Sequence, residues 1–250
     1  MNILFTICGR AGSKGIKNKN IRNFLGKPLP LYTLSAIQLY AEKNILYDID
    51  VALNTDSEEL ISIIKESNMY PVTIVPRKKE LAGDYVAKTE VILDTLISVE
   101  KEKNKDYDML VDLDITSPLR TVDNICDLVN KKINLECDCV FSVTEARRNP
   151  YFNMVMNEGE DGYKRIIESE FVSRQQAPEI YDMNASMYAY NPKYLKAGND
   201  VFDGHCEVIL MEDTGILDLD REGDFELMEV VANYFYRTRI EYGKVAANLK

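Results

Sequence analysis

Hydrophobic residues in this chain fall into short continuous runs that alternate with longer segments of helical spacing. The first run covers residues 2–8, and others cover residues 50–55, 72–75, 107–113 and 138–144. Short apolar runs bounded by polar turns are typical of buried strands. Their regular alternation with helices predicts a three-layer α/β fold built on a mainly parallel sheet.

Helices are expected between these strands. In residues 29–43 and 89–103, apolar side chains recur every three or four positions, which is the spacing of one buried helix face. Another helix is expected after Asp56, which can form a capping box with Glu59, and Thr121 can cap the next helix.

The regular alternation ends after the fifth strand. Residues 147–184 offer short β-like pieces, an Asp-Gly turn at 161–162 and polar connections, so we interpret this segment as an excursion suited to contact with a partner chain. Strands are expected again at residues 185–190 and 206–211, and a helix over residues 224–242 closes the chain.

Length and composition agree with one globular domain over residues 1–250, because 46% of the residues are hydrophobic. The net charge of -11 argues against a general nucleic-acid or anionic-membrane surface. The five cysteines form no CxxC pair, which favours reduced thiols. The apolar run at residues 2–8 is too short for a signal peptide, so we expect a cytoplasmic protein.

The loop at residues 9–20 is the most informative segment. It follows the first strand and contains three glycines and four cations. Glycines let backbone N–H groups approach phosphate oxygens, and Lys and Arg neutralise a triphosphate, so the loop predicts a nucleotide site. Its spacing matches neither a Walker A loop nor a GxGxxG motif. The alternative is a solvated basic loop.

Two further segments are candidates for chemistry. Asp218 and Asp220 are alternate residues, so an extended segment would place both carboxylates on one side, an arrangement suited to Mg²⁺. Taken alone, the pair is more typical of a polar strand end. Arg174 could grip a carboxylate or form a surface salt bridge. His205 is the only histidine, which argues against histidine-based catalysis.

Several sequence blocks occur together and in order: residues 10–15 with Lys19 and Asn20, residues 54–56, Arg77 with residues 80–82 and Asp84, residues 116–120, residues 173–176 with Asn184, and residues 217–220. In this combination the chain resembles the acylneuraminate cytidylyltransferase family, which contains CMP-sialic acid synthetases and their legionaminate and pseudaminate relatives. The resemblance extends over almost the whole chain.

The resemblance implies a nucleotide-diphospho-sugar transferase fold of the glycosyltransferase-A-like type, a homodimer built on the excursion, and transfer of CMP from CTP to a nonulosonic acid. For nucleotide binding it implicates Arg10, Gly12, Ser13, Lys14, Lys19, Asn20 and Arg77. For Mg²⁺ or Mn²⁺ it implicates Asp218 and Asp220, which together with Lys14 and Lys19 would be catalytic. For the sugar it implicates Asp114, Thr116, Arg174, Gln175 and Asn184.

The exact sugar depends on position 114. Sialic-acid enzymes commonly have Gln-Pro where this chain has Asp114 and Ile115, and a carboxylate would repel a sugar acid unless it faces a hydroxyl, an amide or the metal. This difference favours a legionaminate-type sugar. The alternatives are a Kdo cytidylyltransferase, another sugar nucleotidyltransferase, or a non-catalytic nucleotide-binding protein of the same fold.

Overall fold

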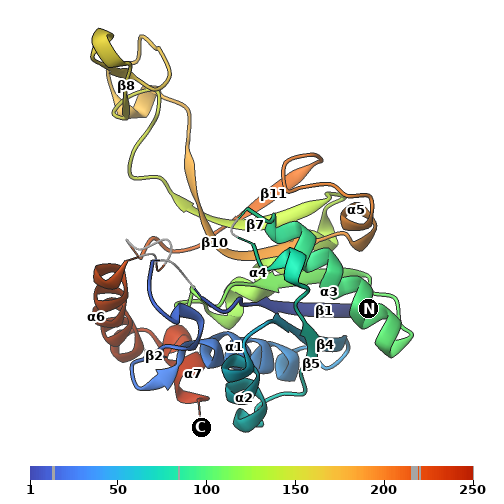
Figure 1. Cartoon of the computed structure of the whole chain (residues 1–250). Helices are drawn as coiled ribbons and strands as arrows, with labels where there is room; N and C mark the ends of the chain where they lie inside the picture. Colours follow the sequence, from blue (N-terminus) through green and yellow to red (C-terminus); the bar gives the residue numbers. More distant parts are fainter. Residues whose placement is uncertain (13–14, 84, 215–218, 220, 250) are drawn as a thin grey trace.

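Strand β1 (Asn2–Cys8) lies inside a seven-stranded sheet in the computed structural model of the chain (Figure 1). The structure describes residues 1–12, 15–83, 85–214, 219 and 221–249. Ile3, Leu4, Phe5 and Ile7 are fully buried, as expected for a strand covered on both faces.

The sheet has the strand order β11-β7-β10-β6-β1-β4-β5. Its other strands are β4 (Asp48–Thr55), β5 (Thr73–Pro76), β6 (Met109–Leu113), β7 (Cys139–Glu145), β10 (Tyr181–Tyr190) and β11 (Cys206–Leu210). Strand β10 runs antiparallel to β6 and β7, whereas the other pairs are parallel. The predicted mainly parallel sheet is confirmed.

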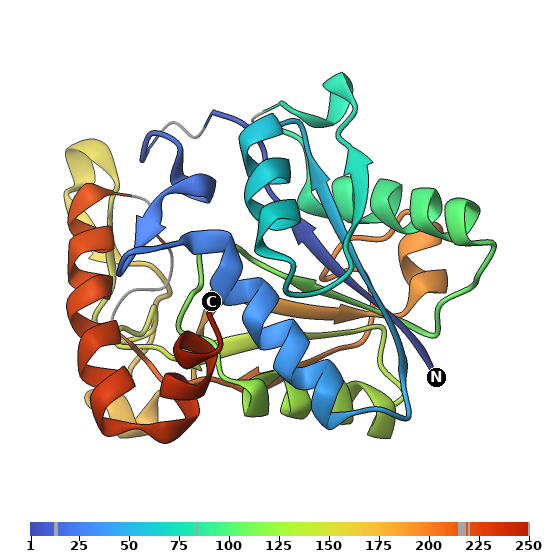
Figure 2. The same ribbon diagram turned by 90° about the horizontal axis from the view of Figure 1, so that it is seen from below.

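Helices cover both faces of this sheet. One layer contains α1 (Leu29–Lys43), α2 (Glu58–Ser67), α4 (Val122–Asn134) and α7 (Ile240–Ala247), and the blue helix α1 crosses in front of the sheet in Figure 2. The opposite layer contains α3 (Lys88–Lys103) and α5 (Pro192–Lys196), and α6 (Glu222–Thr238) packs on α7. The three layers confirm the predicted fold class.

The shorter elements lie outside this sheet. They are the hairpin strands β2 (Asn23–Phe24) and β3 (Lys27–Pro28), the hairpin strands β8 (Val155–Asn157) and β9 (Tyr163–Arg165), and the 3-10 turns η1 (Lys19–Ile21), η2 (Lys79–Leu81), η3 (Gly159–Asp161) and η4 (Arg174–Gln176).

Residues 146–180, which we call the arm, project away from the sheet between β7 and β10 and carry the β8–β9 hairpin at their far end (Figure 1). Tyr181 pairs with Glu145, so β10 begins four residues before the strand expected at residues 185–190. The described part of the chain contains no helix that is long and apolar enough to cross a membrane.

Two details of the sequence prediction are wrong. Ser57 rather than Asp56 caps α2, because the Ser57 hydroxyl oxygen accepts a hydrogen bond from the Leu60 N–H. The single helix predicted over residues 224–242 is two helices, since Arg239 has extended backbone angles that end α6 and start α7 in a new direction. Thr121, by contrast, caps α4 as predicted.

Candidate active site

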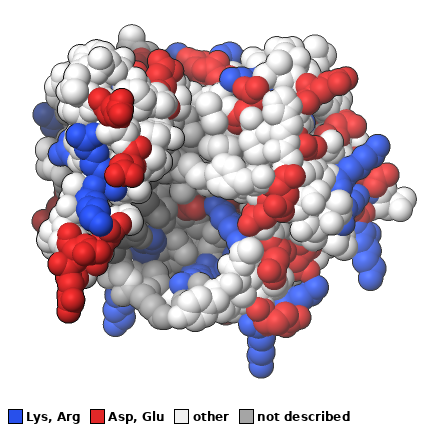
Figure 3. All heavy atoms as spheres, turned by 90° about the horizontal axis from the view of Figure 1, so that it is seen from above, with Lys and Arg blue, Asp and Glu red and all other residues white. Residues whose placement is uncertain are grey.

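A pocket opens at the carboxyl edge of the parallel strands, which is where open α/β sheets bind their ligands. The ends of β1, β5 and β6, together with the start of α3, form its walls. It is lined by Cys8, Arg10, Lys19, Asn20, Arg77, Leu81, Gly83, Val86, Lys88, Val91, Asp114 and Thr116. Figure 3 shows a hollowed face of the molecule with Lys and Arg side chains inside the hollow.

The loop after β1 supplies one wall of this pocket. Gly9 is buried, and a Cβ atom at this position would lie 2.7 Å from Ile115 Cδ1. The backbone at Gly9 therefore closely approaches the loop after β6. Asn20 holds the loop by donating from Nδ2 to the Arg10 carbonyl oxygen, at 3.1 Å. The Ala11 N–H donates to Asp56 Oδ1 at 2.7 Å, which gives Asp56 a role in the loop instead of the helix cap.

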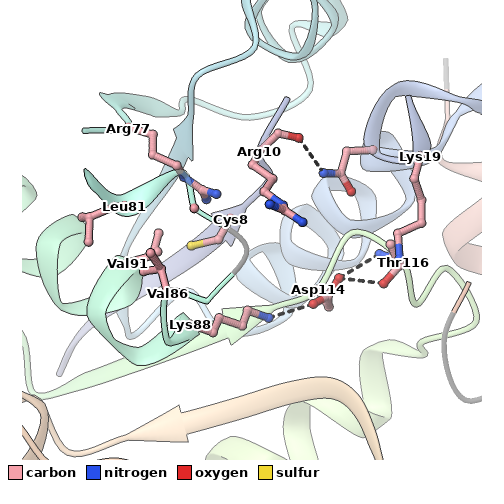
Figure 4. Close-up of a pocket in the computed structure, with 12 residues that line it drawn as sticks. Cys8, Arg10, Lys19, Arg77, Leu81, Val86, Lys88, Val91, Asp114 and Thr116 are labelled. Carbon is pink, nitrogen blue, oxygen red and sulfur yellow. Dashed lines mark hydrogen bonds and ion pairs between the residues drawn. The ribbon is translucent and has the colours of Figure 1, made fainter. Parts of the chain in front are cut away.

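Arg77 supplies the next wall from just beyond β5. Its Nε donates to Asn54 Oδ1 at 2.8 Å and its Nη2 donates to the Asn54 carbonyl oxygen at 3.1 Å. Burial lowers the pKa of Arg77. Figure 4 shows the Arg10 and Arg77 side chains directed toward the same space, so two segments far apart in sequence bring positive charge together.

The opposite wall contains a lysine that the sequence analysis missed. Lys88 Nζ lies 2.7 Å from Asp112 Oδ2 and 2.8 Å from Asp114 Oδ2. Burial alone would lower the pKa of Lys88, but the two carboxylates raise it well above its ordinary value. Lys88 is the first residue of α3, where a cation opposes the helix dipole. This unfavourable placement is the signal in the sequence that could have identified Lys88 as a site residue.

Asp114 is fully engaged by neighbouring groups. Its Oδ1 accepts from the Thr116 N–H at 3.0 Å and from Thr116 Oγ1 at 2.8 Å, while Oδ2 pairs with Lys88. Burial alone would raise the pKa of Asp114, but Lys88 and the Thr116 hydrogen bonds together hold it well below its ordinary value. The carboxylate that was expected to face the sugar or a metal is therefore already paired with a lysine.

The remaining sugar-site candidates lie apart from this pocket. Arg174 and Gln175 line a second pocket at the root of the arm, and Arg174 Nη2 donates to the Ala146 carbonyl oxygen at 2.6 Å. Asn184 lines a small third cavity, where its Oδ1 accepts from Ser142 Oγ at 2.6 Å. Within one copy of the chain, these side chains do not converge on the pocket that Arg10, Lys19 and Arg77 line.

Four predicted site residues lie outside the described residues: Ser13, Lys14, Asp218 and Asp220. Gly12, which precedes Ser13, has a left-handed backbone with φ of 70°, and Leu219, between the two aspartates, is fully buried. The described ranges hold no group of three His, Cys, Asp or Glu side chains suited to a metal ion. The proposed metal ligands therefore rest on the sequence.

Comparison with known proteins decides the class. Residues 4–240 match the family model described as cytidylyltransferase. The chain belongs to the cytidylyltransferase family. Among its relatives, "Post-translational flagellin modification protein B" of Campylobacter coli is 35% identical over 91% of this chain and 93% of its own length. "CMP-N,N'-diacetyllegionaminic acid synthase" of Campylobacter jejuni is 34% identical over the same shares of each chain, 91% and 93%.

The fold of this cytidylyltransferase also has solved counterparts. The structure of CMP:2-keto-3-deoxy-manno-octonic acid synthetase complexed with CTP superposes with a TM-score of 0.66. It covers 94% of this chain and 99% of its own at 12% identity, which establishes a shared fold. With the family match and the relatives of similar sequence, the chain is a nucleotidyltransferase of the acylneuraminate cytidylyltransferase type, as its sequence blocks predicted.

Proposed function

We propose that this cytidylyltransferase transfers CMP from CTP to the anomeric hydroxyl of a free nonulosonic acid of the legionaminate type. The observation that carries the proposal is the gathering of Arg10, Lys19 and Arg77 around one pocket at the carboxyl edge of the sheet. The acceptor is suggested by the relative named "CMP-N,N'-diacetyllegionaminic acid synthase".

In this proposal the loop after β1 holds the nucleotide. Arg10, Lys14 and Lys19 bind the triphosphate, and the glycine-containing segment with Gly12 and Ser13 would let backbone N–H groups approach its oxygens. On the adjoining wall, Asn20 and Arg77 lie at the nucleotide. Cations at these positions stabilise both the bound triphosphate and the departing pyrophosphate.

The reaction is a single in-line displacement. The anomeric hydroxyl oxygen forms a bond to the α-phosphorus, the bond from that phosphorus to the β-phosphate oxygen breaks, and pyrophosphate leaves while the hydroxyl loses its proton. Positioning and charge stabilisation supply most of the catalysis in such transfers. This fits a chain whose only histidine, His205, is exposed.

Asp218 and Asp220 are the proposed ligands of Mg²⁺ or Mn²⁺. Two carboxylates and phosphate oxygens form a donor set that Mg²⁺ accepts, and the ion would neutralise charge on the phosphates. Asp220→Asn should lower turnover on the order of a hundredfold or more while leaving most CTP affinity intact. A variant with normal turnover would remove Asp220 from the metal site.

For the sugar acid we propose a site that a homodimer completes. Arg174 and Gln175 lie at the root of the arm, outside the nucleotide pocket, and with Thr116 and Asn184 they would contact the acid. In this proposal residues 1–250 form one cytidylyltransferase domain, and residues 147–184 are the excursion through which two copies dimerise. A guanidinium such as that of Arg174 suits a sugar carboxylate.

The proposal is tested by incubating purified protein with CTP, Mg²⁺ and one acceptor at a time. The acceptors are diacetyllegionaminate, pseudaminate, N-acetylneuraminate, Kdo and a neutral sugar phosphate. We expect pyrophosphate release and a CMP-sugar by mass spectrometry with diacetyllegionaminate. Release only with Kdo or with the sugar phosphate would overturn the nonulosonic acid assignment, and CTP binding without release from any acceptor would favour a binding protein.

A further inference from the structure

Asp112 and Asp114 form a pair of carboxylates at the nucleotide pocket, where Asp114 lines the wall and Asp112 is fully buried behind it. They are alternate residues at the end of β6, so both side chains point to the α3 side. The chain thus contains a second Asp-Leu-Asp segment, with the same spacing as residues 218–220. Two carboxylates beside a triphosphate would repel it strongly if nothing compensated their charge.

Lys88 is placed to compensate that charge. Its ammonium lies between the two carboxylates, 2.7 Å from Asp112 Oδ2 and 2.8 Å from Asp114 Oδ2. Asp112 is fully buried and its Oδ1 accepts from Thr6 Oγ1 at 2.7 Å, so the pair is anchored in the sheet. The Lys88 side chain keeps 35% of its surface exposed and lines the pocket itself (Figure 4).

We propose that Lys88 is a positioning residue that makes the carboxylates of Asp112 and Asp114 compatible with an anionic nucleotide. It fixes Asp114, and through Thr116 the loop after β6, while it lowers the negative charge at the pocket wall. The proposal rests on CTP as the substrate of this pocket. CTP affinity then depends on the net charge of the three side chains and not on a contact from Lys88 to the nucleotide.

Lys88→Met tests this directly, because it makes the net charge of the three side chains more negative by one. We expect the Kd of CTP to rise on the order of tenfold or more, that of CMP to rise less, and the difference to shrink in high salt. A general structural defect would weaken CMP and CTP equally and would not respond to salt. Equal weakening of both would therefore overturn the proposal.

A second variant keeps the test valid if Lys88→Met fails to fold. Lys88→Met combined with Asp112→Asn restores the original net charge, and the asparagine can still accept from Thr6. This double variant should fold and bind CTP within about threefold of the wild type. A folded double variant that binds CTP about tenfold more weakly would show that Lys88 contacts the nucleotide itself, and the proposal would be wrong.

Lys196→Met is the matched control, because Lys196 makes one ion pair with Glu100 of α3, at 2.8 Å, away from the pocket. It should leave the CTP and CMP constants unchanged. The CTP and CMP binding measurements use no sugar acid, so they do not depend on the proposed acceptor. A failure of the Lys88 proposal can therefore be told apart from a failure of the proposed function. Turnover by the wild type, with identical CTP affinity in Lys88→Met, would reject only the role of Lys88.

Discussion

Arg77 shows how a single side chain is prepared for binding. Two of its nitrogen atoms are held by Asn54, which is fully buried, so the guanidinium is fixed before a ligand arrives. Fixing a cation in advance reduces the entropy lost on binding. A lysine cannot reproduce this forked geometry, although it carries the same charge.

Arg77→Lys should therefore raise the Kd of CTP about tenfold, measured by isothermal titration calorimetry. The matched control is Arg237→Lys on the exposed side of α6, which should bind CTP as the wild type does. An unchanged Kd in Arg77→Lys would mean that charge alone matters at this position.

The close packing around Gly9 leads to a prediction about stability. In Gly9→Ala, the new Cβ would lie 2.7 Å from Ile115 and 2.8 Å from Leu60, both fully buried. Overpacking of this kind should lower the free energy of unfolding by about 1–3 kcal/mol in urea denaturation. Gly223→Ala, where a Cβ meets nothing within 4 Å, is the control and should not destabilise. Equal stability of both variants would contradict the close approach at Gly9.

At the scale of elements, the hydrophobic pattern predicted the sheet and its covering helices because burial follows directly from the spacing of apolar residues. The division between α6 and α7 was not predictable, since the apolar spacing continues through it and Arg239 is neither Gly nor Pro. The break lets α7 pack on α1, where Ser35 Oγ donates to the Val245 carbonyl oxygen. Such tertiary contacts override local sequence preference.

The candidate site was also predictable only in part. Loop residues such as Arg10 and Lys19 stand out because glycines and cations concentrate after a strand. Lys88 was missed because its significance depends on Asp112 and Asp114, which lie more than 20 residues away and approach it only through the fold. The separation of Arg174 from the pocket lined by Arg10 and Lys19 likewise depends on the arm and not on local sequence.

Asp50 joins β4 to the end of α3 and to the segment that follows this helix. It pairs with Lys103 and Lys105, each at 2.7 Å, and accepts from the Tyr107 hydroxyl at 2.9 Å. Burial alone would raise the pKa of Asp50, but these three partners hold it below its ordinary value of 3.8. The folded state therefore binds fewer protons than the unfolded state as the pH falls below that value.

Asp50→Asn should consequently lower the free energy of unfolding by about 1–2 kcal/mol at pH 7, measured by urea denaturation. The deficit should be complete above the unfolded pKa of the carboxyl and should disappear as the pH falls through the lower folded pKa. A deficit that persists unchanged at acid pH would show that the carboxylate charge is not responsible.

At the scale of the whole molecule, the arm exposes apolar side chains that a lone copy leaves in water. Val155, Tyr163 and Val172 are exposed by 60%, 73% and 81% respectively. Exposed apolar groups on a projecting segment are typical of a protein contact. This supports the proposal that the arm forms the interface of a homodimer.

Replacing residues 146–180 with Asn-Gly tests that assignment. Glu145 and Tyr181 are paired, so a two-residue turn can join them without disturbing the sheet. We expect a folded monomer by analytical ultracentrifugation, with CTP affinity retained and turnover of the sugar acid lost. A dimer without the arm would place the interface elsewhere, and full turnover would exclude Arg174 and Gln175 from the sugar site.

The root of the arm also has a mechanical consequence. Strands β7 and β10 are both interior strands, and beyond the root of the arm β7 also pairs with β11 over residues 139–143 and β10 with β6 over residues 187–190. A load applied to the arm along these strands must shear two ladders of hydrogen bonds per strand before either strand can slide. The arm is thus anchored in the interior of the sheet, and a pull on it would be carried by β10 to β6, the strand that ends just before Asp114.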